Sequence, residues 1–335
     1  MCRAEAIHFE ERRLKLVALL PVRDESDVIA QSLKRLLEWA DRIYVYDTGS
    51  VDGTWEIVND LAVIDKRVVP VIRKPVYFSE TLVRRYLFEV ARNDLRTGDW
   101  FARVDADEFH HVDPRVFIRE RVGKLEGVIY HQYYDFCLLA SEAERLAAAK
   151  AIEDERRNPI EQRRRHYIVM RYAEPRFCRY RETMRWGPDC SFPFNAGFVA
   201  RARIPIRHYP RRDPLQLAKR CALRSVMIRD PVSRQNWRNP EEHHWWKTDW
   251  KQFVTPDAEP GLRRWQPGEE LPEVRQQNHL KRGAVRAAQY VLHRYLVRWV
   301  DRFRPLDGLI EPMPIQDEVQ ARIVEAYRAL EDQWK

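Results

Sequence analysis

Residues 14–25 read LKLVALLPVRDE, and this stretch decides the fold. Its first part, LKLVALL, is a short apolar run without polar alternation, which is typical of a strand buried on both faces of a parallel sheet. Asp24 or Ser26 can cap a following helix, whose apolar residues recur at helical spacing through residues 29–40. We therefore expect the fold to begin with a buried strand and an amphipathic helix.

Strand and helix patterns keep alternating as far as residue 104. We predict strands over residues 42–46, 67–73 and 100–104, and helices over residues 54–61 and 79–95. Pro70 lies inside the second of these strands and indicates a bulge or an edge position. Such alternation is typical of a parallel sheet that is covered by helices on both faces.

The pattern after residue 114 is less regular. We predict strands over residues 128–136, 167–180 and 198–206, exposed helix over 141–165 with a break at Pro159, an irregular connection over 251–280, and a helix over 283–303. The expected fold class is α/β, with a mostly parallel sheet and helices on both faces. We expect a core domain over residues 1–225 and a largely helical C-terminal region over residues 226–335.

The composition is that of a globular protein. The 335 residues are 44% hydrophobic and 33% charged, which excludes a disordered, collagen-like or coiled-coil chain. No apolar run approaches the roughly 18 residues of a membrane span, and acids and bases occupy the N-terminus where a secretory signal needs an apolar core. We therefore expect a cytoplasmic protein. The five cysteines form no C-x-x-C pair, so neither a disulfide framework nor a zinc knuckle is encoded.

Two acidic clusters follow predicted strands, DTGSVDGT at residues 47–54 and DADE at residues 105–108. Each alone could be a turn or a solvated loop end, but the carboxyl ends of parallel strands are where open sheets bind ligands. Asp105 and Asp107, one residue apart at a strand end, are expected to point to the same side, where one can hold a metal and the other a ribose hydroxyl. Asp47 can accept an N–H from a nucleobase. Together the clusters favour a site for a metal–nucleoside diphosphate.

These motifs, in the order P-x-x-D-E, D-x-G-S-x-D-G-T and D-A-D-E, resemble the nucleotide-binding half of family-two glycosyltransferases with the GT-A fold. The resemblance is close over residues 14–112 and looser to about residue 224. It implies a donor site that includes Pro21, Asp24, Glu25, Asp47, Asp52, Arg85 (or its neighbour Arg84) and Asp105. It also implies that Asp107 binds a divalent metal, Mn²⁺ or Mg²⁺, with Asp105 holding the donor ribose or the same metal.

The segment between residues 201 and 224 is strongly basic. It contains eight Lys and Arg residues and one acid, Asp213, so it is either an exposed basic surface or part of a phosphate site. The run around His208, IRHYPRRDP, resembles a His-Tyr segment of family-two relatives. By this resemblance His208 completes the metal site or touches the diphosphate, while Arg211 and its neighbours neutralise the leaving group.

Processive members of this family carry Q-x-x-R-W and membrane helices. Here residues 182–186 read ETMRW, an imperfect match, and no membrane helix is encoded, so we expect the addition of a single sugar. The tryptophans would suit sugar stacking at an acceptor site or pack in a core. The cluster considered for stacking is Trp237, Trp245, Trp246 and Trp250.

An inverting transfer needs a carboxylate that takes the acceptor proton. Asp189 is our candidate, since Gly187 and Pro188 force a turn and the neighbouring Trp186 could stack on a sugar; its alternative is an ordinary turn aspartate. The reserve candidates are Glu182, Asp213 and Glu108.

The expected function is therefore a metal-dependent inverting glycosyltransferase that moves one sugar from a nucleoside-diphosphate sugar to a hydroxyl of a glycan or lipid-linked glycan. The net charge, 59 − 51 = +8, favours anionic partners without choosing among them. A sugar nucleotidyltransferase is the first alternative, but PVRDES lacks the glycine-rich loop of that class. A basic nucleic-acid-binding protein is the second, and we expect no nucleic acid partner.

The C-terminal helix predicted over residues 283–303 is amphipathic, with arginines recurring on the face opposite its apolar residues. It either packs in a core with a solvated basic face or makes a peripheral contact with an anionic membrane surface.

Overall fold

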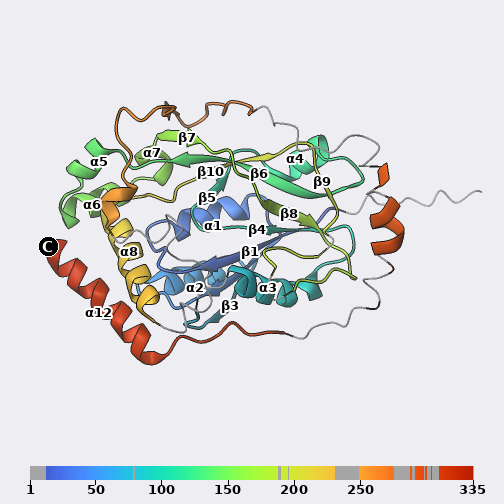
Figure 1. Cartoon of the computed structure of the whole chain (residues 1–335), viewed down its shortest axis with the longest axis horizontal. Coiled ribbons are helices and arrows are strands. Elements are labelled where there is room, and N and C mark those ends of the chain that lie inside the picture. The colour runs from blue at the N-terminus through green and yellow to red at the C-terminus, as the bar shows by residue number, and fades with distance from the viewer. Residues whose placement is uncertain are drawn as a thin grey trace, which may run out of the picture.

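The computed structural model describes residues 13–77, 80–187, 190–194, 196–230, 249–274, 287–288, 291–297, 299, 303 and 309–334. A curled sheet runs through the middle of the molecule, and helices cover both of its faces (Figure 1). Helices α8 and α12 stand together at one end of the sheet, on the left in Figure 1. The α/β fold class predicted from the sequence is confirmed.

The first half of the sheet is parallel. Its strands are β1 (Leu16–Val22), β2 (Arg42–Asp47), β3 (Val68–Arg73) and β4 (Trp100–Arg103), in the order β4-β1-β2-β3. β3 is the edge strand, and its register shifts by one residue between Val45 and Tyr46 of β2, so both expectations for Pro70 are confirmed. Because β1 lies between β2 and β4, the two acidic clusters flank the end of β1.

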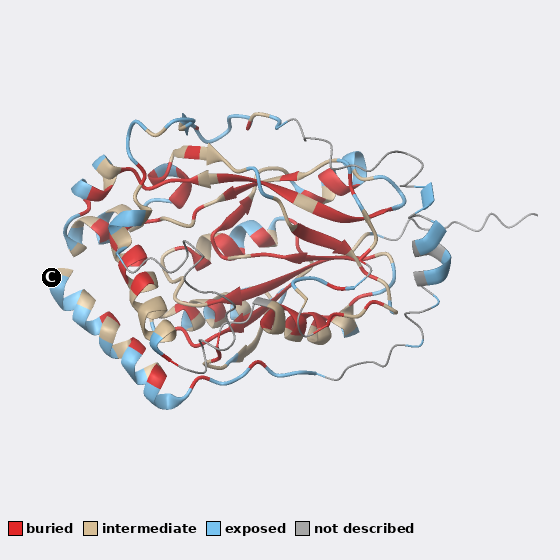
Figure 2. Ribbon diagram, in the orientation of Figure 1, coloured by how far each residue is buried: buried red, intermediate tan, exposed pale blue. Residues whose placement is uncertain are grey.

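Side chains of β1 alternate between two hydrophobic cores. Leu16, Ala18 and Leu20 pack with helix α1 (Ile29–Leu37), and Val17 and Leu19 pack with helix α3 (Glu80–Ala91). Burial is continuous along this strand (Figure 2). Helix α2 (Thr54–Ile64) packs beside α1 and β3. The apolar run LKLVALL therefore places helices on both faces of the sheet.

The capping residue predicted for α1 is wrong. The helix begins at Ile29 after Val28, which makes no side-chain capping hydrogen bond. Asp24 and Ser26 instead lie in the loop between β1 and α1, where they contact the loop after β2. The polar side chains of this loop thus contact a neighbouring loop and do not cap the helix.

The second half of the sheet contains most of the antiparallel pairs. The long strand β6 (Glu126–Phe136) belongs to both halves. Strand β8 (Pro175–Arg179) lies between β4 and β6 and pairs with each of them in antiparallel direction. The other strands are β5 (Glu108–His110), β7 (His166–Val169), β9 (Phe198–Val199), β10 (Ile204–His208) and β11 (Arg263–Arg264). The predicted strands over 167–180 and 198–206 are each two strands, because a loop interrupts each run.

Short helices connect these strands. They are α4 (Pro114–Arg121), α5 (Ala140–Arg145), α6 (Ala149–Arg156) and α7 (Ile160–Arg163), with 3₁₀ turns at Arg92–Asp94 and Trp250–Phe253. The predicted helix over 141–165 is broken into three pieces, and Pro159 precedes the last of them as expected. Strand β5 and helix α4 were not predicted, because each is too short to show a clear hydrophobic period.

Helix α8 (Pro214–Arg229) follows β10 and carries the C-terminal helix α12 (Asp317–Trp334) on its side. Asp213 caps α8 by accepting a hydrogen bond from the backbone N–H of Gln216 over 2.8 Å. The domain boundary predicted at residue 225 falls inside α8. An irregular connection was predicted over residues 251–280. Residues 251–274, the part of it that the structure describes, are mostly irregular.

The predicted helix over 283–303 is described only in part. Leu292–Val297 form a turn of π-helix, and Leu292, Leu296, Trp299 and Phe303 are exposed, so these side chains are not packed in a core. Among the described residues, no helix is long and apolar enough to cross a membrane.

One partly buried histidine should make stability depend on pH. The ring of His110 lies edge-on to Trp39 and Phe177, and burial, assisted by Arg176 and Arg207, lowers its pKa to about 3. The unfolded imidazole takes up a proton below about pH 6.5. The free energy of unfolding should therefore fall as the pH drops from about 6.5 toward 3.

In His110→Phe this contribution should disappear. Chemical denaturation at a series of pH values should give a flatter curve below pH 6.5, by up to about 1.4 kcal/mol per pH unit. His131 is present in both proteins and supplies a common background. Parallel curves for the two proteins would contradict the prediction.

Candidate functional site

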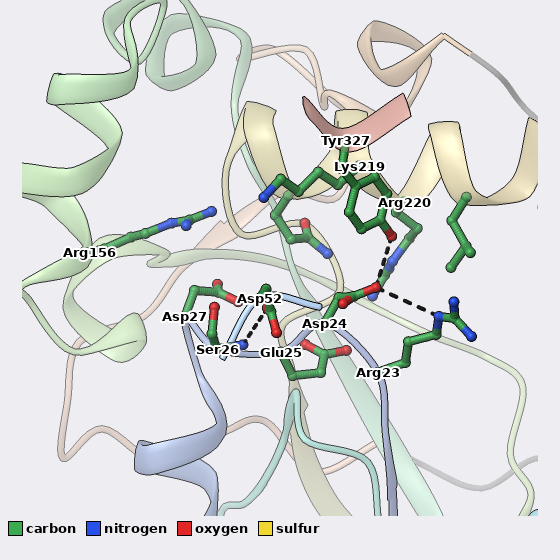
Figure 3. Close-up of a pocket in the computed structure, with 12 residues that line it drawn as sticks. Arg23, Asp24, Glu25, Ser26, Asp27, Asp52, Arg156, Lys219, Arg220 and Tyr327 are labelled. Carbon is green, nitrogen blue, oxygen red and sulfur yellow. Dashed lines mark hydrogen bonds and ion pairs between the residues drawn. The ribbon is translucent and has the colours of Figure 1, made fainter. Parts of the chain in front are cut away.

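The loops after β1 and β2 are joined by hydrogen bonds. The consecutive backbone N–H groups of Asp24, Glu25 and Ser26 donate to Ser50 Oγ (2.9 Å), Thr54 Oγ1 (2.8 Å) and Asp52 Oδ2 (2.9 Å), respectively. Asp24 Oδ1 accepts in return from the N–H of Val51 over 2.8 Å. The hydroxyls and carboxylate of DTGSVDGT therefore fix the backbone of the preceding loop (Figure 3).

Asp47 ends β2 and is completely buried. Its Oδ1 accepts from the N–H groups of Gly49 (2.8 Å) and Ser50 (2.7 Å), which forms a tight turn in which Gly49 has a φ of 108°. Its Oδ2 is buried and has no hydrogen-bond partner among the described residues. Burial raises the pKa of Asp47 despite the two N–H donors.

The DADE segment is a turn that follows β4, and its two aspartates have different partners. β4 ends at Arg103, and the N–H of Glu108 donates to Asp105 O over 3.1 Å. Arg84 Nη2 donates to Asp105 Oδ1 over 2.6 Å. Burial alone would raise the pKa of Asp105, but Arg84 and then Arg176 hold it well below its usual value.

Asp107 belongs to a different set of contacts. Strand β5 pairs with β10 so that Glu108 lies opposite His208, and the N–H of Tyr209 donates to Asp107 O over 2.8 Å. His208 Nε2 lies 3.8 Å from Asp107 Oδ1, and its Nδ1 lies 2.8 Å from Asp135 Oδ1 on β6. The pairing of β5 with β10 thus brings together two residues that are about a hundred positions apart in the sequence.

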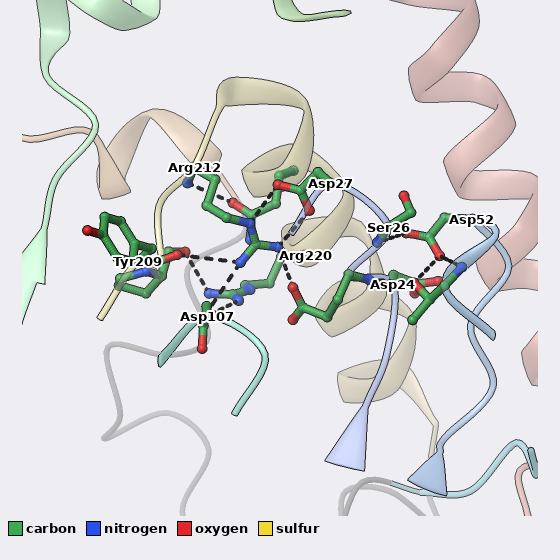
Figure 4. Close-up of polar contacts among 12 residues, drawn as sticks. Asp24, Ser26, Asp27, Asp52, Asp107, Tyr209, Arg212 and Arg220 are labelled. Atoms are coloured by element: carbon green, nitrogen blue, oxygen red, sulfur yellow. Dashed lines mark hydrogen bonds and ion pairs between the residues drawn. The ribbon is translucent and has the colours of Figure 1, made fainter. Parts of the chain in front are cut away.

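Arginines from the loop after β10 and from α8 approach the other oxygen of Asp107. Arg212 Nη1 and Arg220 Nη2 each lie 3.6 Å from Asp107 Oδ2 (Figure 4). Burial alone would lower the pKa of His208, but Asp135 and Asp107 raise it to about 9. Asp107 therefore lies among positive groups, in the arrangement that suits a phosphate or an anionic leaving group.

Arg212 is completely buried and links the two halves of the site. Its Nε donates to Asp27 Oδ2 over 2.7 Å, its Nη2 donates to Asp27 Oδ1 over 3.0 Å, and its Nη2 also contacts Glu25. Burial raises the pKa of Glu25, and the nearby carboxylate of Asp107 raises it further. For Asp27, the neighbouring Arg212 outweighs burial and lowers the pKa. One guanidinium thus joins the loop after β1 to the turn after β4.

Asp107 and His208 fit a divalent cation as far as their donor atoms are concerned. A carboxylate oxygen and an imidazole nitrogen meet from different elements, and both are ligands of Mn²⁺-type ions. Asp135 Oδ1 accepts a hydrogen bond from the far nitrogen of the imidazole, as the partners of metal-bound histidines commonly do. In the described residues, no group of three or more His, Cys, Asp or Glu side chains is arranged to hold a metal by itself. A metal here would need further oxygen ligands from a diphosphate.

A small cavity of about 80 Å³ opens between the loop after β1 and the helices α6, α8 and α12. Asp24, Asp27 and Asp52 line one side, and Arg156, Lys219 and Arg220 line the other (Figure 3). Tyr327 of α12 forms part of its wall. The cavity lies next to Asp107 because Arg220 reaches both.

A comparison with models of known families gives one informative match. Residues 18–120 match glycosyl transferase family 2. The matched segment runs from within β1 to nearly the end of α4 and contains both acidic clusters, so the resemblance seen in the sequence is confirmed for this part of the chain. A search of curated proteins gives no match.

Two solved structures are similar to the chain. One is a mannosyltransferase from Pyrobaculum calidifontis in complex with GDP-mannose and Mn²⁺, at 13% identity, covering 97% of this chain and 88% of the other, with a TM-score of 0.36. The second is a glucosyl-3-phosphoglycerate synthase from Mycobacterium tuberculosis in complex with Mn²⁺, UDP and glucosyl-3-phosphoglycerate, at 16% identity, covering 43% and 52%, with a TM-score of 0.24. Both scores are below 0.5, so we draw nothing further from these likenesses.

The structure places several of the predicted arginines differently from expectation. Arg211 donates to Thr255 Oγ1 over 3.1 Å, and its neighbour Arg212 takes the place beside Asp107. Arg84, rather than Arg85, pairs with Asp105, although both arginines are buried. In each pair the two adjacent arginines have different partners. The sequence pattern did not give the direction of each side chain.

The remaining donor candidates are at the expected loop, with carboxylates that already have partners. Pro21 lies in β1 opposite Tyr46, next to the ends of β1 and β2. Asp24 and Asp52 hold the two loops together, and Glu25 contacts Arg212. Their positions support a structural contribution to the site.

The predicted base, Asp189, lies outside the described residues, as do Trp237, Trp245 and Trp246. Trp186 is buried against Phe88 and Phe101, so the expectation that it stacks on a sugar is wrong. Trp250 packs beside Trp334 of α12, with 6.0 Å between the ring centroids. The sequence patterns for sugar stacking were ambiguous because buried and exposed tryptophans look alike.

The structure describes all three reserve candidates for the base. Asp213 is buried and accepts two hydrogen bonds of 2.9 Å from Arg156. Glu108 is buried beside Arg176 and Tyr133. The N–H of Glu182 donates to Thr97 Oγ1. Thr97 precedes β4, whereas Asp107 follows it, so Glu182 lies near the other end of that strand.

Asp27 and Asp135 belong to the site but were not predicted. Asp27 sits two residues after the matched P-x-x-D-E motif, and Asp135 lies within the strand run VIYHQYYDF. A charged residue inside an otherwise buried strand was the available signal for Asp135, since a buried carboxylate needs a partner.

Removing the charge of Arg212 should destabilise the protein. In Arg212→Met the buried carboxylates of Asp27 and Glu25 lose their main partner, and the free energy of unfolding should fall by about 3–5 kcal/mol. Urea denaturation measures the change. Arg211→Met is the matched control, with an expected loss below about 1.5 kcal/mol. Equal losses in the two variants would contradict a special role for Arg212.

Proposed function

We propose that this chain is a metal-dependent glycosyltransferase that moves one sugar from a nucleoside-diphosphate sugar to a hydroxyl group, with inversion at the anomeric carbon. The observation that carries the proposal is the meeting of Asp107, His208, Arg212 and Arg220 at the end of β4, inside and beside the segment that matches glycosyl transferase family 2. This arrangement combines metal-type ligands with cations suited to a diphosphate.

Asp107 and His208 would hold the divalent cation, Mn²⁺ or Mg²⁺, which on binding supplies positive charge to the diphosphate oxygens. Arg220 and Arg212, 3.6 Å from Asp107, add fixed positive charge at the same place. Departure of the nucleoside diphosphate develops negative charge, and preorganised cations stabilise that charge. These arginines therefore act on the leaving group.

The nucleoside would lie across the ends of β1 and β2. Asp47 offers Oδ2 as an acceptor for a base N–H, because this buried oxygen has no partner in the described structure. Asp105 is within reach of the same side of the sheet and would bind the ribose while Arg84 holds its other oxygen. A buried oxygen without a hydrogen bond is costly, so binding of a base N–H here would be favourable.

The acceptor we propose is a hydroxyl of a glycan or lipid-linked glycan. The exposed side chains Leu292, Leu296, Trp299 and Phe303 would suit peripheral contact with an anionic membrane surface where such lipids are found. Because the proposed acceptor and the exposed side chains do not indicate which sugar is transferred, a panel of donors is needed to test the activity.

The proposed activity is tested by incubating the full chain with Mn²⁺ and a panel of nucleoside-diphosphate sugars, with and without glycan acceptors. Release of nucleoside diphosphate that increases with acceptor is expected. Pyrophosphate formation from a nucleoside triphosphate and a sugar phosphate would indicate a nucleotidyltransferase instead. No donor turnover with any sugar, together with salt-sensitive binding of nucleic acid, would overturn the proposal.

Asp107→Asn should abolish metal-dependent donor binding while the fold is retained. The substitution removes the carboxylate charge that a divalent cation requires but keeps the side-chain size. Isothermal titration calorimetry with a nucleoside diphosphate and Mn²⁺ measures the effect. Asp113→Asn, which changes only the cap of α4, is the matched control and should bind normally. Unchanged affinity in Asp107→Asn would contradict the assignment.

Asp189 remains our proposal for the base that takes the acceptor proton. Asp189→Asn should lower kcat by about 10²–10⁴-fold, the usual contribution of a general base, and leave donor affinity unchanged. Steady-state kinetics with saturating donor measures kcat. Near-normal turnover in this variant would assign the role to another carboxylate.

A further inference from the structure

Helix α12 crosses the two loops that form the candidate donor site. Gln320 Oε1 accepts a hydrogen bond from Arg23 Nη2 over 3.1 Å, and Gln320 Nε2 donates to Gly49 O over 3.2 Å. About two helical turns after Gln320, the hydroxyl of Tyr327 donates to Asp24 Oδ2 over 2.9 Å (Figure 3). Residues about 300 positions apart in the sequence are therefore in direct contact.

The loop that α12 touches has a backbone conformation that needs support. Asp24 has a φ of 54°, in the left-handed region that non-glycine residues rarely adopt. Such residues persist where surrounding contacts determine their conformation. Asp24 has contacts on every side, from Ser50, Val51 and Tyr327. Arg23 is held as well, by donation from its Nη1 to Thr48 O over 2.7 Å.

Helix α12 is anchored independently of these loops. Val319 and Ile323 are buried and pack with Leu223 and Val226 of α8. The segment before the helix is tied to the chain after β3, since the N–H of Ile315 donates to Pro75 O over 2.9 Å. The N–H of Tyr77 donates to Met313 O over 2.9 Å. The helix is therefore a fixed support, and its polar side chains transmit that position to the loops.

We propose that Gln320 and Tyr327 are positioning residues for the donor site, which act by holding Arg23, Asp24 and Gly49 in the geometry that a nucleoside diphosphate requires. This inference rests on the proposed function. Gly49 follows Asp47 by two residues, so a shift of its carbonyl moves the turn that presents Asp47. Preorganised loops bind with less loss of conformational freedom, so loss of either contact should weaken donor binding.

Contacts of Tyr327 extend beyond its hydrogen bond to Asp24. Lys219 of α8 lies over the ring of Tyr327, with 5.5 Å from its Nζ to the centroid. Tyr327 and Lys219 both line the small cavity beside Asp24 and Arg220. The tyrosine is thereby held on its ring face by α8 and on its hydroxyl by the loop. Its placement depends on packing that remains when the hydroxyl alone is removed.

The test uses Tyr327→Phe and Gln320→Ala in the full chain. Each should raise the Kd of a nucleoside diphosphate with Mn²⁺, and the KM of the donor sugar, by about threefold to tenfold, while kcat changes less than twofold. Tyr44→Phe is the matched control for the first variant, because its hydroxyl contacts Asp94 near the amino end of the sheet. Gln333→Ala, at an exposed position of α12, is the control for the second.

A second readout does not depend on any ligand. Amide hydrogen exchange of residues 24–26 and 50–54 should be faster in Tyr327→Phe and Gln320→Ala than in the controls. If the wild-type chain binds no nucleoside diphosphate, the proposed function fails, and exchange alone then decides whether α12 positions these loops. Unchanged exchange, or unchanged Kd in a chain that does bind, would overturn the inference.

Discussion

Buried carboxylates at the ends of parallel strands need positive partners, and this requirement shapes the whole candidate site. Removing a carboxylate from water without a partner is costly, so each must be paired or neutral. Arg212 is the central partner, since it is fully buried and contacts carboxylates from the loop after β1 while lying 3.6 Å from Asp107 after β4. The register of β10 against β5 places Arg212 and His208 beside Asp107. Fold and site therefore depend on the same charge balance.

Much of the fold could be predicted from local sequence. The run LKLVALL is apolar on both faces, so it had to be a buried central strand, and the alternating patterns up to residue 104 place the parallel strands and their helices. Pro70 indicated both the edge and the bulge because it lacks a backbone N–H. The motif DTGSVDGT indicated the loop after β2, where its Ser, Asp and Thr side chains satisfy backbone N–H groups.

The partners of the acidic residues could not be predicted, because they come from long-range pairing. Nothing near Asp107 in the sequence indicates His208 or Arg212, which depend on β10 pairing with β5 and β6. Arg211 and Arg212 are adjacent residues of the same type, but Arg211 contacts Thr255 whereas Arg212 contacts Asp27. Helix α12 was also hidden, since its contact with Asp24 joins opposite ends of the chain. Hydrophobic period predicts elements, whereas tertiary packing decides which side chains meet.

The central claim is that Asp107 and His208 form the protein side of a metal–diphosphate site. Crystals of the full chain grown with Mn²⁺ and a nucleoside diphosphate, measured for the anomalous scattering of manganese, test it most directly. The account predicts one manganese peak within about 2.0–2.4 Å of Asp107 and His208 ligand atoms, with diphosphate oxygens completing its coordination. A bound nucleoside diphosphate whose manganese peak lies away from Asp107, or a peak held by other carboxylates, would contradict it.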